Sequence, residues 1–134
     1  MTRPDISFVV QTLSQFLQSP KKSHREAAIR VVKYIKVHLA MGILLSSKKE
    51  NKLTTYCDAD WASCPDTRRS VTGFIIKHGE SLVSWRSKKQ ATISRSSAKS
   101  EYRSMASIVS ELVCLTALFK ELGEELEMPI NVFL

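Results

Sequence analysis

The chain has 134 residues, with 20 Lys and Arg against 13 Asp and Glu, which leaves a formal net charge of +7. This length allows one modest domain, or a small domain with a helical extension. Hydrophobic residues make up 43% of the chain, so collagen-like and disordered compositions are excluded. The basic excess favours a polyanionic partner, with nucleic acid the first expectation and an anionic membrane surface the second.

The cysteines and the lack of targeting signals indicate where the protein is expected to be located. No apolar run approaches the roughly 20 residues that span a bilayer. The N-terminus lacks the apolar core and small-residue cleavage site of a secretory signal. Cys57, Cys64 and Cys114 are odd in number and form no C-x-x-C pair. They predict reduced thiols in an intracellular protein, with disulfide and zinc roles disfavoured.

Residues 1–50 predict two amphipathic helices. The first begins with Thr2 as its cap and Pro4 in its first turn, and it ends at Ser19-Pro20. The second begins at Ser23, with Glu26 as a capping-box partner, and stops at Gly42. The spacing of its apolar residues predicts a stripe of Ala28, Val31, Val32, Ile35 and Leu39.

A domain boundary is predicted at the polar stretch 48–52, which divides the chain into residues 1–50 and 51–134. Two amphipathic helices bury little apolar surface alone, so we expect the first segment to pack on something else. A basic flank on its second helix is either a solvated face or a contact to a nucleic-acid backbone. This flank consists of Arg30, Lys33 and Lys36.

The second segment opens with a strand predicted from Leu53 to Cys57 and ending in a carboxylate, Asp58. Strand alternation places Leu53, Thr55 and Cys57 on one face, and Tyr56 and Asp58 on the other. A carboxylate at a strand end, followed by small residues and a turn, can hold a metal ion. The same residue more often simply forms the turn.

A hairpin follows, with strands predicted at Ser70–Lys77 and Ser81–Trp85 around a turn at 78–80. After it, a basic and hydroxyl-rich loop is predicted to leave the edge of the sheet. Such a loop is either a surface for phosphate contacts or an ordinary solvated loop. Its basic residues are Arg86, Lys88, Lys89 and Arg95.

A long helix is predicted from Ala98 to Gly123, with Ser96-Ser97 as its cap. Glu101 stands one turn before Met105, at the head of the apolar stripe. The helix dipole alone favours a glutamate in a first turn, but one on the inward side, near another carboxylate, could share a divalent cation. Residues 129–134 begin a further strand. The predicted stripe is Met105, Ile108, Val109, Leu112, Leu115, Phe119 and Leu122.

Three strands with a hairpin, a long helix and a further strand predict an α/β fold of the ribonuclease H type. In that fold the first three strands are antiparallel, a helix crosses the sheet, and the fourth strand is added in parallel. Hydrolysis of a phosphodiester by two metal ions about 3.5–4 Å apart requires a cluster of carboxylates. Magnesium prefers such oxygen ligands.

The chain resembles the end of the Pol polyprotein of copia-type LTR retrotransposons of plants. Residues 2–6 and 13–16 are similar to the segment that connects reverse transcriptase to ribonuclease H. The other matching blocks resemble the ribonuclease H domain of that family, in order and at the family's spacing. They are Tyr56–Ala62, Arg68–Gly73, Ser84–Gln90 and Ser96–Arg103.

This resemblance implies hydrolysis of the RNA strand of an RNA–DNA hybrid, with two Mg²⁺ ions in the complete site. It makes Asp58 and Glu101 the first and second catalytic carboxylates, both of which bind metal and position the attacking water. Asp60 is assigned no metal, and Arg86 to Lys89 would lie near the hybrid. The expected partners are a hybrid or other nucleic acid and the reverse transcriptase portion of the polyprotein, with no membrane. The expected location is cytoplasmic or nuclear, in virus-like particles of the parent element.

Two departures from the family pattern stand out. Lys99 replaces a usual glutamate and removes a capping-box partner from Ser96. The chain stops at Leu134, before the family's third catalytic Asp and fourth metal-binding position. A site that lacks half its carboxylates should bind Mg²⁺ weakly, so we expect a truncated and inactive fragment. The alternatives are a non-catalytic nucleic-acid-binding module and a degenerate transposon relic without a selected role.

Overall fold

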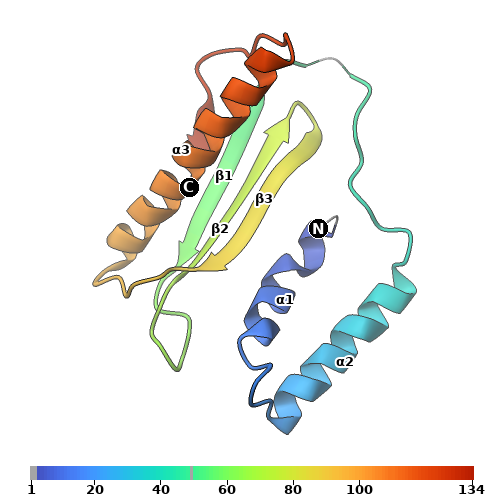
Figure 1. The fold of residues 1–134 in the computed structure, drawn as a ribbon, viewed down its shortest axis with the longest axis vertical. Coiled ribbons are helices and arrows are strands. Elements are labelled where there is room, and N and C mark those ends of the chain that lie inside the picture. The colour runs from blue at the N-terminus through green and yellow to red at the C-terminus, as the bar shows by residue number, and fades with distance from the viewer. Residues whose placement is uncertain (1–2, 49) are drawn as a thin grey trace. The chain divides into compact units, whose positions relative to one another are not determined.

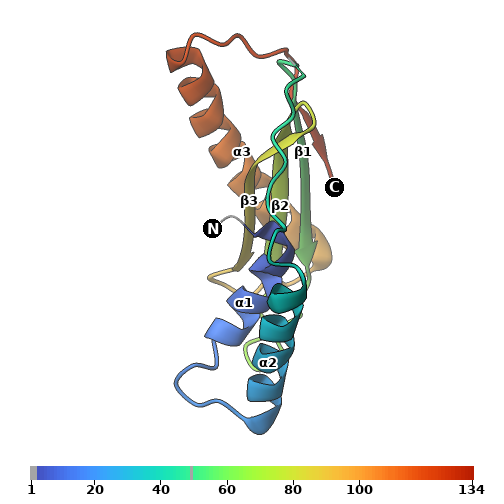
Figure 2. The ribbon, with the colours of Figure 1, turned by 90° about the vertical axis from the view of Figure 1, so that its right-hand side faces the viewer.

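The computed structural model describes residues 3–48 and 50–134 (Figures 1 and 2). The chain divides into two compact units, residues 1–43 and 44–134, each with its own internal contacts. The elements in chain order are η1 (Pro4–Ile6), α1 (Ser7–Ser14), α2 (Lys22–Val37), β1 (Leu53–Asp60), β2 (Val71–His78), β3 (Ser81–Lys89), α3 (Ser97–Glu121) and β4 (Asn131–Phe133).

The boundary between the units falls after Ile43, a few residues before the predicted position at 50. The intervening residues belong to the second unit because the hairpin holds them. The backbone N–H of Ser46 donates to Ser81 Oγ at 2.8 Å. The N–H of Gly79, which has a φ of 56°, donates to the Lys52 carbonyl at 2.8 Å.

The first unit is a pair of short helices, and its described residues, from Arg3 to Ile43, form no buried core. No residue of η1, α1 or α2 is buried. An open apolar groove of about 520 Å³ lies along the two helices, lined in part by Leu13, Phe16 and Val31. This agrees with the expectation that the two helices bury little apolar surface by themselves, since isolated helices of this length are marginal in water.

The predicted limits of the second helix are corrected. The helix α2 begins at Lys22, so Ser23 lies inside it, and Lys21 caps the helix instead. His24 supports this start because its Nδ1 accepts a hydrogen bond from the Lys21 N–H at 3.2 Å, and its ring stacks on Phe16 at 3.9 Å. The predicted cap of the first helix, Thr2, lies outside the described residues.

The end and the apolar side of α2 also differ from the prediction. The helix stops at Val37 rather than near Gly42, because the chain leaves helical geometry at His38. Leu39 is therefore outside the helix and 76% exposed. Ala28 and Val32 are exposed, and the half-buried side is rotated from the predicted stripe to include Ala27, Val31, Tyr34 and Ile35.

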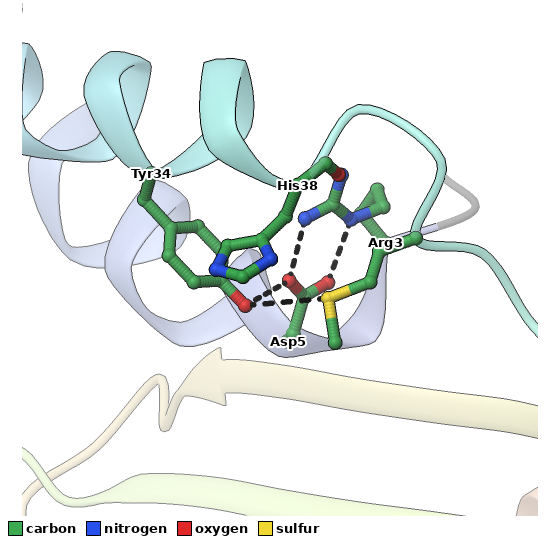
Figure 3. A network of polar contacts seen from close by, with 5 residues as sticks. Arg3, Asp5, Tyr34 and His38 are labelled. Carbon is green, nitrogen blue, oxygen red and sulfur yellow. Dashed lines mark hydrogen bonds and ion pairs between the residues drawn. The ribbon is translucent and has the colours of Figure 1, made fainter.

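A polar network holds the start of the chain against α2 (Figure 3). The Arg3 guanidinium donates to both carboxylate oxygens of Asp5, at 3.0 and 2.8 Å, and to the His38 carbonyl at 2.9 Å. The Tyr34 hydroxyl also donates to Asp5, at 2.9 Å. Hydrogen bonds from Arg3, and then from Tyr34, hold the pKa of the Asp5 carboxyl well below its usual range.

The second unit is a mixed four-stranded sheet with one long helix against it (Figure 1). The strand order is β3-β2-β1-β4. The pairs β1–β2 and β2–β3 are antiparallel, and β4 joins β1 in parallel. The mixed α/β class, the hairpin and the parallel fourth strand are therefore confirmed.

Two predicted strands are longer than expected. The strand β1 continues past Cys57 to Asp60, because Asp58 pairs with Gly73 and Asp60 pairs with Val71 of β2. The strand β3 runs to Lys89 instead of ending at Trp85. Asp58 therefore lies within a strand rather than after its end.

The core lies between the sheet and one side of α3. Ser96 caps the helix as predicted, because its Oγ accepts from the Lys99 N–H at 3.3 Å. The predicted stripe is wrong at Val109 and Leu122, which are 52% and 68% exposed. The buried side of α3 begins before Met105, where the predicted stripe began, and comprises Ser100, Ser104, Ile108 and Leu112. The two serines are small and let the helix approach the sheet closely. Of the buried helix residues, Ile108 and Leu112 pack with Leu53, Cys57, Phe74 and Ile76.

The helix α3 is long and apolar enough to cross a membrane by length and composition alone. Its buried side packs on the sheet, and core helices of folded domains pass the same test. Four residues of α3 are buried, and 17% of its most apolar stretch is covered by the rest of the domain.

Replacement of Ile108 tests the core. Ile108 is 0% exposed, so Ile108→Ala should lower the free energy of unfolding by about 2–5 kcal/mol. The matched control is Val109→Ala at the exposed neighbour, with an expected change within about 0.5 kcal/mol. Urea denaturation followed by circular dichroism measures both changes, and equal effects would contradict the observed packing.

The Asp5 network predicts a pH dependence for the first unit. The folded pKa of Asp5 lies below the unfolded value of about 3.9. The network therefore contributes its full stabilisation above about pH 4 and loses it as the pH falls through the folded pKa. Carboxyl ¹³C NMR should show Asp5 still ionised below its ordinary pKa. In the Arg3→Met variant the titration midpoint of Asp5 should rise toward its ordinary value. An unchanged midpoint would show that Arg3 does not lower the pKa of Asp5.

Candidate nucleic-acid and metal site at one end of the sheet

Asp58 lies on the face of the sheet that α3 leaves open. Cys57 is buried, and Tyr56, Asp58 and Asp60, which alternate with the buried positions, are exposed. One Asp58 carboxylate oxygen, Oδ1, accepts from the Ala59 N–H at 2.7 Å. This contact leaves the remaining lone pairs of the carboxylate available for a ligand.

Glu101 reaches the same end of the sheet from α3. The buried Ser104, one turn further along the helix, donates from its Oγ to the Asp58 carbonyl at 3.0 Å. This bond places the helical turn that carries Glu101 beside the backbone of Asp58. Glu101 is half-buried, as expected for a residue next to the buried side of the helix.

The structure links Asp58 and Glu101 through the backbone, because the Ser104 bond ends on the Asp58 carbonyl and not on its carboxylate. Carboxylate oxygens are ligands that Mg²⁺ accepts, usually one or two per ion, with water completing the shell. Within residues 3–48 and 50–134 there is no cluster of three or more His, Cys, Asp or Glu placed to hold a metal ion. The described residues therefore do not form the cluster of carboxylates that two metal ions require.

The structure corrects the predicted position of the basic residues. Arg86, Lys88 and Lys89 lie in β3 rather than in a loop, and only Arg95 lies in the loop that follows. Arg86, Lys88 and Arg95 are exposed. Lys89 is half-buried, and its Nζ lies 3.1 Å from Cys64 Sγ. The four residues predicted to contact nucleic acid therefore belong to two segments, the strand β3 and the loop that follows it.

Sequence reasoning missed the residue that connects these segments, Gln90. Its Nε2 donates to Thr72 Oγ1 and to the Ser100 carbonyl, both at 3.0 Å. Its Oε1 accepts from Ser94 Oγ at 3.0 Å. Gln90 thus joins β2, the loop and the first turn of α3. No pattern of charge or hydropathy marks a single glutamine for such a role.

The loop after β1 contains a thiol in an unusual setting. Hydrogen bonding from Thr67, and then the contact with Lys89, lowers the pKa of Cys64 to about 7. By contrast, burial raises the pKa of the Cys57 thiol in the core. Nothing in the sequence indicated that the pKa values of these two thiols differ, because the difference depends on the contacts of Cys64 with Thr67 and Lys89.

Fold and site together define a mixed α/β domain in which Asp58, the helical turn that carries Glu101, and several basic residues lie at one end of the sheet. No family model and no solved structure matches the chain. The retrovirus-related Pol polyprotein from transposon RE1 of Arabidopsis thaliana is 41% identical over 132 residues, or 98% of this chain. The Pol polyprotein from transposon TNT 1-94 of Nicotiana tabacum is 33% identical over 122 residues.

A third relative is not named as a Pol polyprotein. The secreted RxLR effector protein 161 of Plasmopara viticola is 40% identical over 116 residues, which cover 87% of this chain and 82% of that protein. The chain belongs to the family of retrovirus-related Pol polyproteins from plant transposons. It spans 9% of the length of the RE1 polyprotein that it matches.

Thiol reactivity tests the Cys64 environment. Because the pKa of Cys64 is lowered to about 7, its alkylation rate should rise with pH through a midpoint near neutrality. Thr67→Val and Lys89→Met should each move this midpoint upward, because each removes a group that favours the thiolate. Mass spectrometry of iodoacetamide-treated protein resolves Cys64 from the exposed Cys114. A Cys64 midpoint that stays unchanged in both variants would contradict the described contacts.

Proposed function

We propose that residues 51–134 are the ribonuclease H-like region of a retrotransposon Pol polyprotein, which acts on the RNA strand of RNA–DNA hybrids. The observation that carries the proposal is the Ser104 hydrogen bond to the Asp58 carbonyl, which brings the turn of Glu101 beside Asp58. The mixed sheet with a parallel fourth strand supports it. In this proposal, residues 1–50 connect the domain to the reverse transcriptase portion of the polyprotein.

Asp58 and Glu101 would provide carboxylate oxygens to Mg²⁺ in this domain. When bound, the metal ions would activate a water and stabilise the charge that develops on the phosphate. The protein's own part is to hold the carboxylates at fixed positions on β1 and α3 and to attract the polyanion with its basic side chains. No cluster of three or more metal-binding side chains lies among the described residues, which supports weak metal binding by this segment and little or no activity.

A second candidate function is nucleic-acid binding without cleavage. The observation that favours it is the charge of residues 86–103, which contain six Lys or Arg and a single carboxylate, Glu101. Such binding would be mainly electrostatic, so its affinity should fall steeply as salt rises. Binding that persists in the absence of divalent cations, with no cleavage in their presence, would favour this function.

The nuclease proposal is tested with an end-labelled RNA–DNA hybrid in Mg²⁺ and in Mn²⁺. The substrate is given to this chain and to a version extended with the sequence that follows the matching segment in the RE1 polyprotein. The extended version should cleave the RNA strand, and the present chain should show little or no cleavage. Cleavage by neither protein would reject the nuclease function.

Substitution in the extended version tests the roles of the carboxylates. Loss of residues that only support metal ligands typically costs 10–100-fold, so Asp58→Asn and Glu101→Gln should each lower cleavage by about a hundredfold or more. Asp60→Asn is the matched control on the same strand, and it should retain activity. Equal losses at Asp58 and Asp60 would reject the assignment of Asp58.

A further inference from the structure

Trp61 is a large aromatic side chain that is held in place and yet remains open to solvent. It directly follows β1, and 48% of its surface is exposed. Its indole Nε1 donates to the Ser94 carbonyl at 3.0 Å, so the ring is tied to the loop before α3. A ring that is both oriented and accessible is preorganised for a flat ligand.

The two segments that hold Trp61 are themselves fixed. On the strand side, the Ala62 N–H donates to the Oγ of the buried Ser70 at 3.1 Å, and Ala62 has a φ of 53°. On the loop side, Ser94 is 3% exposed. Its Oγ donates to Gln90 and accepts from Arg103, both at 3.0 Å. The orientation of the indole is therefore set by buried and half-buried hydrogen bonds.

Basic segments flank the ring. One is the loop that follows Trp61, which carries Arg68 and Arg69 and is tied to the end of β3 by the Gln90 N–H bond to the Ser70 carbonyl at 2.8 Å. The other is the loop that carries Ser94. Residues 86–103 contain six cationic side chains and a single carboxylate, Glu101. The cationic residues of that stretch are Arg86, Lys88, Lys89, Arg95, Lys99 and Arg103.

We propose that Trp61 is a stacking platform for an unpaired base of single-stranded RNA or DNA, and that the flanking Lys and Arg side chains contact its phosphates. Aromatic side chains bind bases through their π-faces without strong sequence preference, and basic grooves follow the backbone. The inference rests on the proposed function only in taking nucleic acid as the partner, and it requires no catalysis.

The nearby carboxylates determine which part of a nucleotide fits over the indole. Asp58 and Asp60 precede Trp61 on β1, and both are exposed. They repel phosphate, whereas a neutral base meets no charge penalty there. The phosphates would therefore follow the basic segments while the base occupies the ring. An intact duplex does not present base faces in this way, so single strands should depend on Trp61 more than blunt duplexes do.

Fluorescence separates Trp61 from the only other tryptophan, Trp85, which lies in β3 paired with Ile75. In Trp85→Phe the emission comes from Trp61, and oligo(dT) or oligo(U) of about 12 nucleotides should quench it on binding. In Trp61→Phe the emission comes from Trp85 and should change little. Quenching confined to Trp85 would overturn the inference.

Affinity provides the second readout. Base stacking on an aromatic side chain is worth about 1–3 kcal/mol, so Trp61→Ala should weaken single-strand binding about fivefold or more. Its effect on a blunt RNA–DNA hybrid should be smaller, and the dependence of log affinity on log salt should keep its slope because the phosphate contacts remain. Arg95→Ala, as the comparison, should reduce that slope.

Trp61→Phe guards against loss of the fold. It keeps an aromatic ring but lacks the N–H that bonds to Ser94, so its affinity should lie between those of Trp61→Ala and the parent chain. If Trp61→Ala binds single strands as tightly as the parent chain while Asp58 is still required for cleavage by the extended version, the stacking inference fails and the nuclease proposal stands. If the parent chain binds no nucleic acid even at low salt, the stacking inference fails together with nucleic acid as the partner.

Discussion

The second unit depends on the close approach of α3 to β1, which the two buried serines make possible. Ser100 and Ser104 are fully buried where larger residues would hold the helix away from the sheet. Ser104 uses this proximity to donate to the Asp58 carbonyl. A hydrogen bond to a strand carbonyl fixes the height of the helix along the strand more tightly than apolar packing does, because its geometry is directional. The position of Glu101 relative to Asp58 follows from this bond.

The same end of the sheet carries both signs of charge, on different segments. The carboxylates of Asp58 and Asp60 come from the exposed positions of β1, while the cationic side chains come from β3, its following loop and the start of α3. In the proposed nuclease, the cationic segments would attract the polyanion that the carboxylates alone would repel. Gln90 and Ser94 join β2, the loop after β3 and the start of α3 through half-buried hydrogen bonds, which holds the cationic segments together.

Much of the second unit follows from sequence, because its strands alternate regularly and its helix has a strong cap. The faces of β1, the hairpin and the Ser96 cap were all predictable. The lengths of β1 and β3 were not, because polar residues such as Asp58 and Lys88 extend a strand only when the partner strand is there to pair with them. The buried stripe of α3 was misplaced because hydropathy ranks Val109 above Ser104, whereas the close contact with the sheet selects the smaller residue. The roles of Trp61 and Gln90 were not predictable, because they depend on hydrogen bonds to residues far away in the sequence.

The central claim is that Asp58 and Glu101 act on one cation, and Mn²⁺ titration followed by NMR tests it on this chain without reference to activity. Paramagnetic broadening should appear first, and together, at the amides of residues 57–60 and 100–102, and Asp58→Asn should weaken it at both segments. Broadening that begins instead among the acidic residues Glu124, Glu125 and Glu127, or that affects the two segments independently, would contradict a shared site.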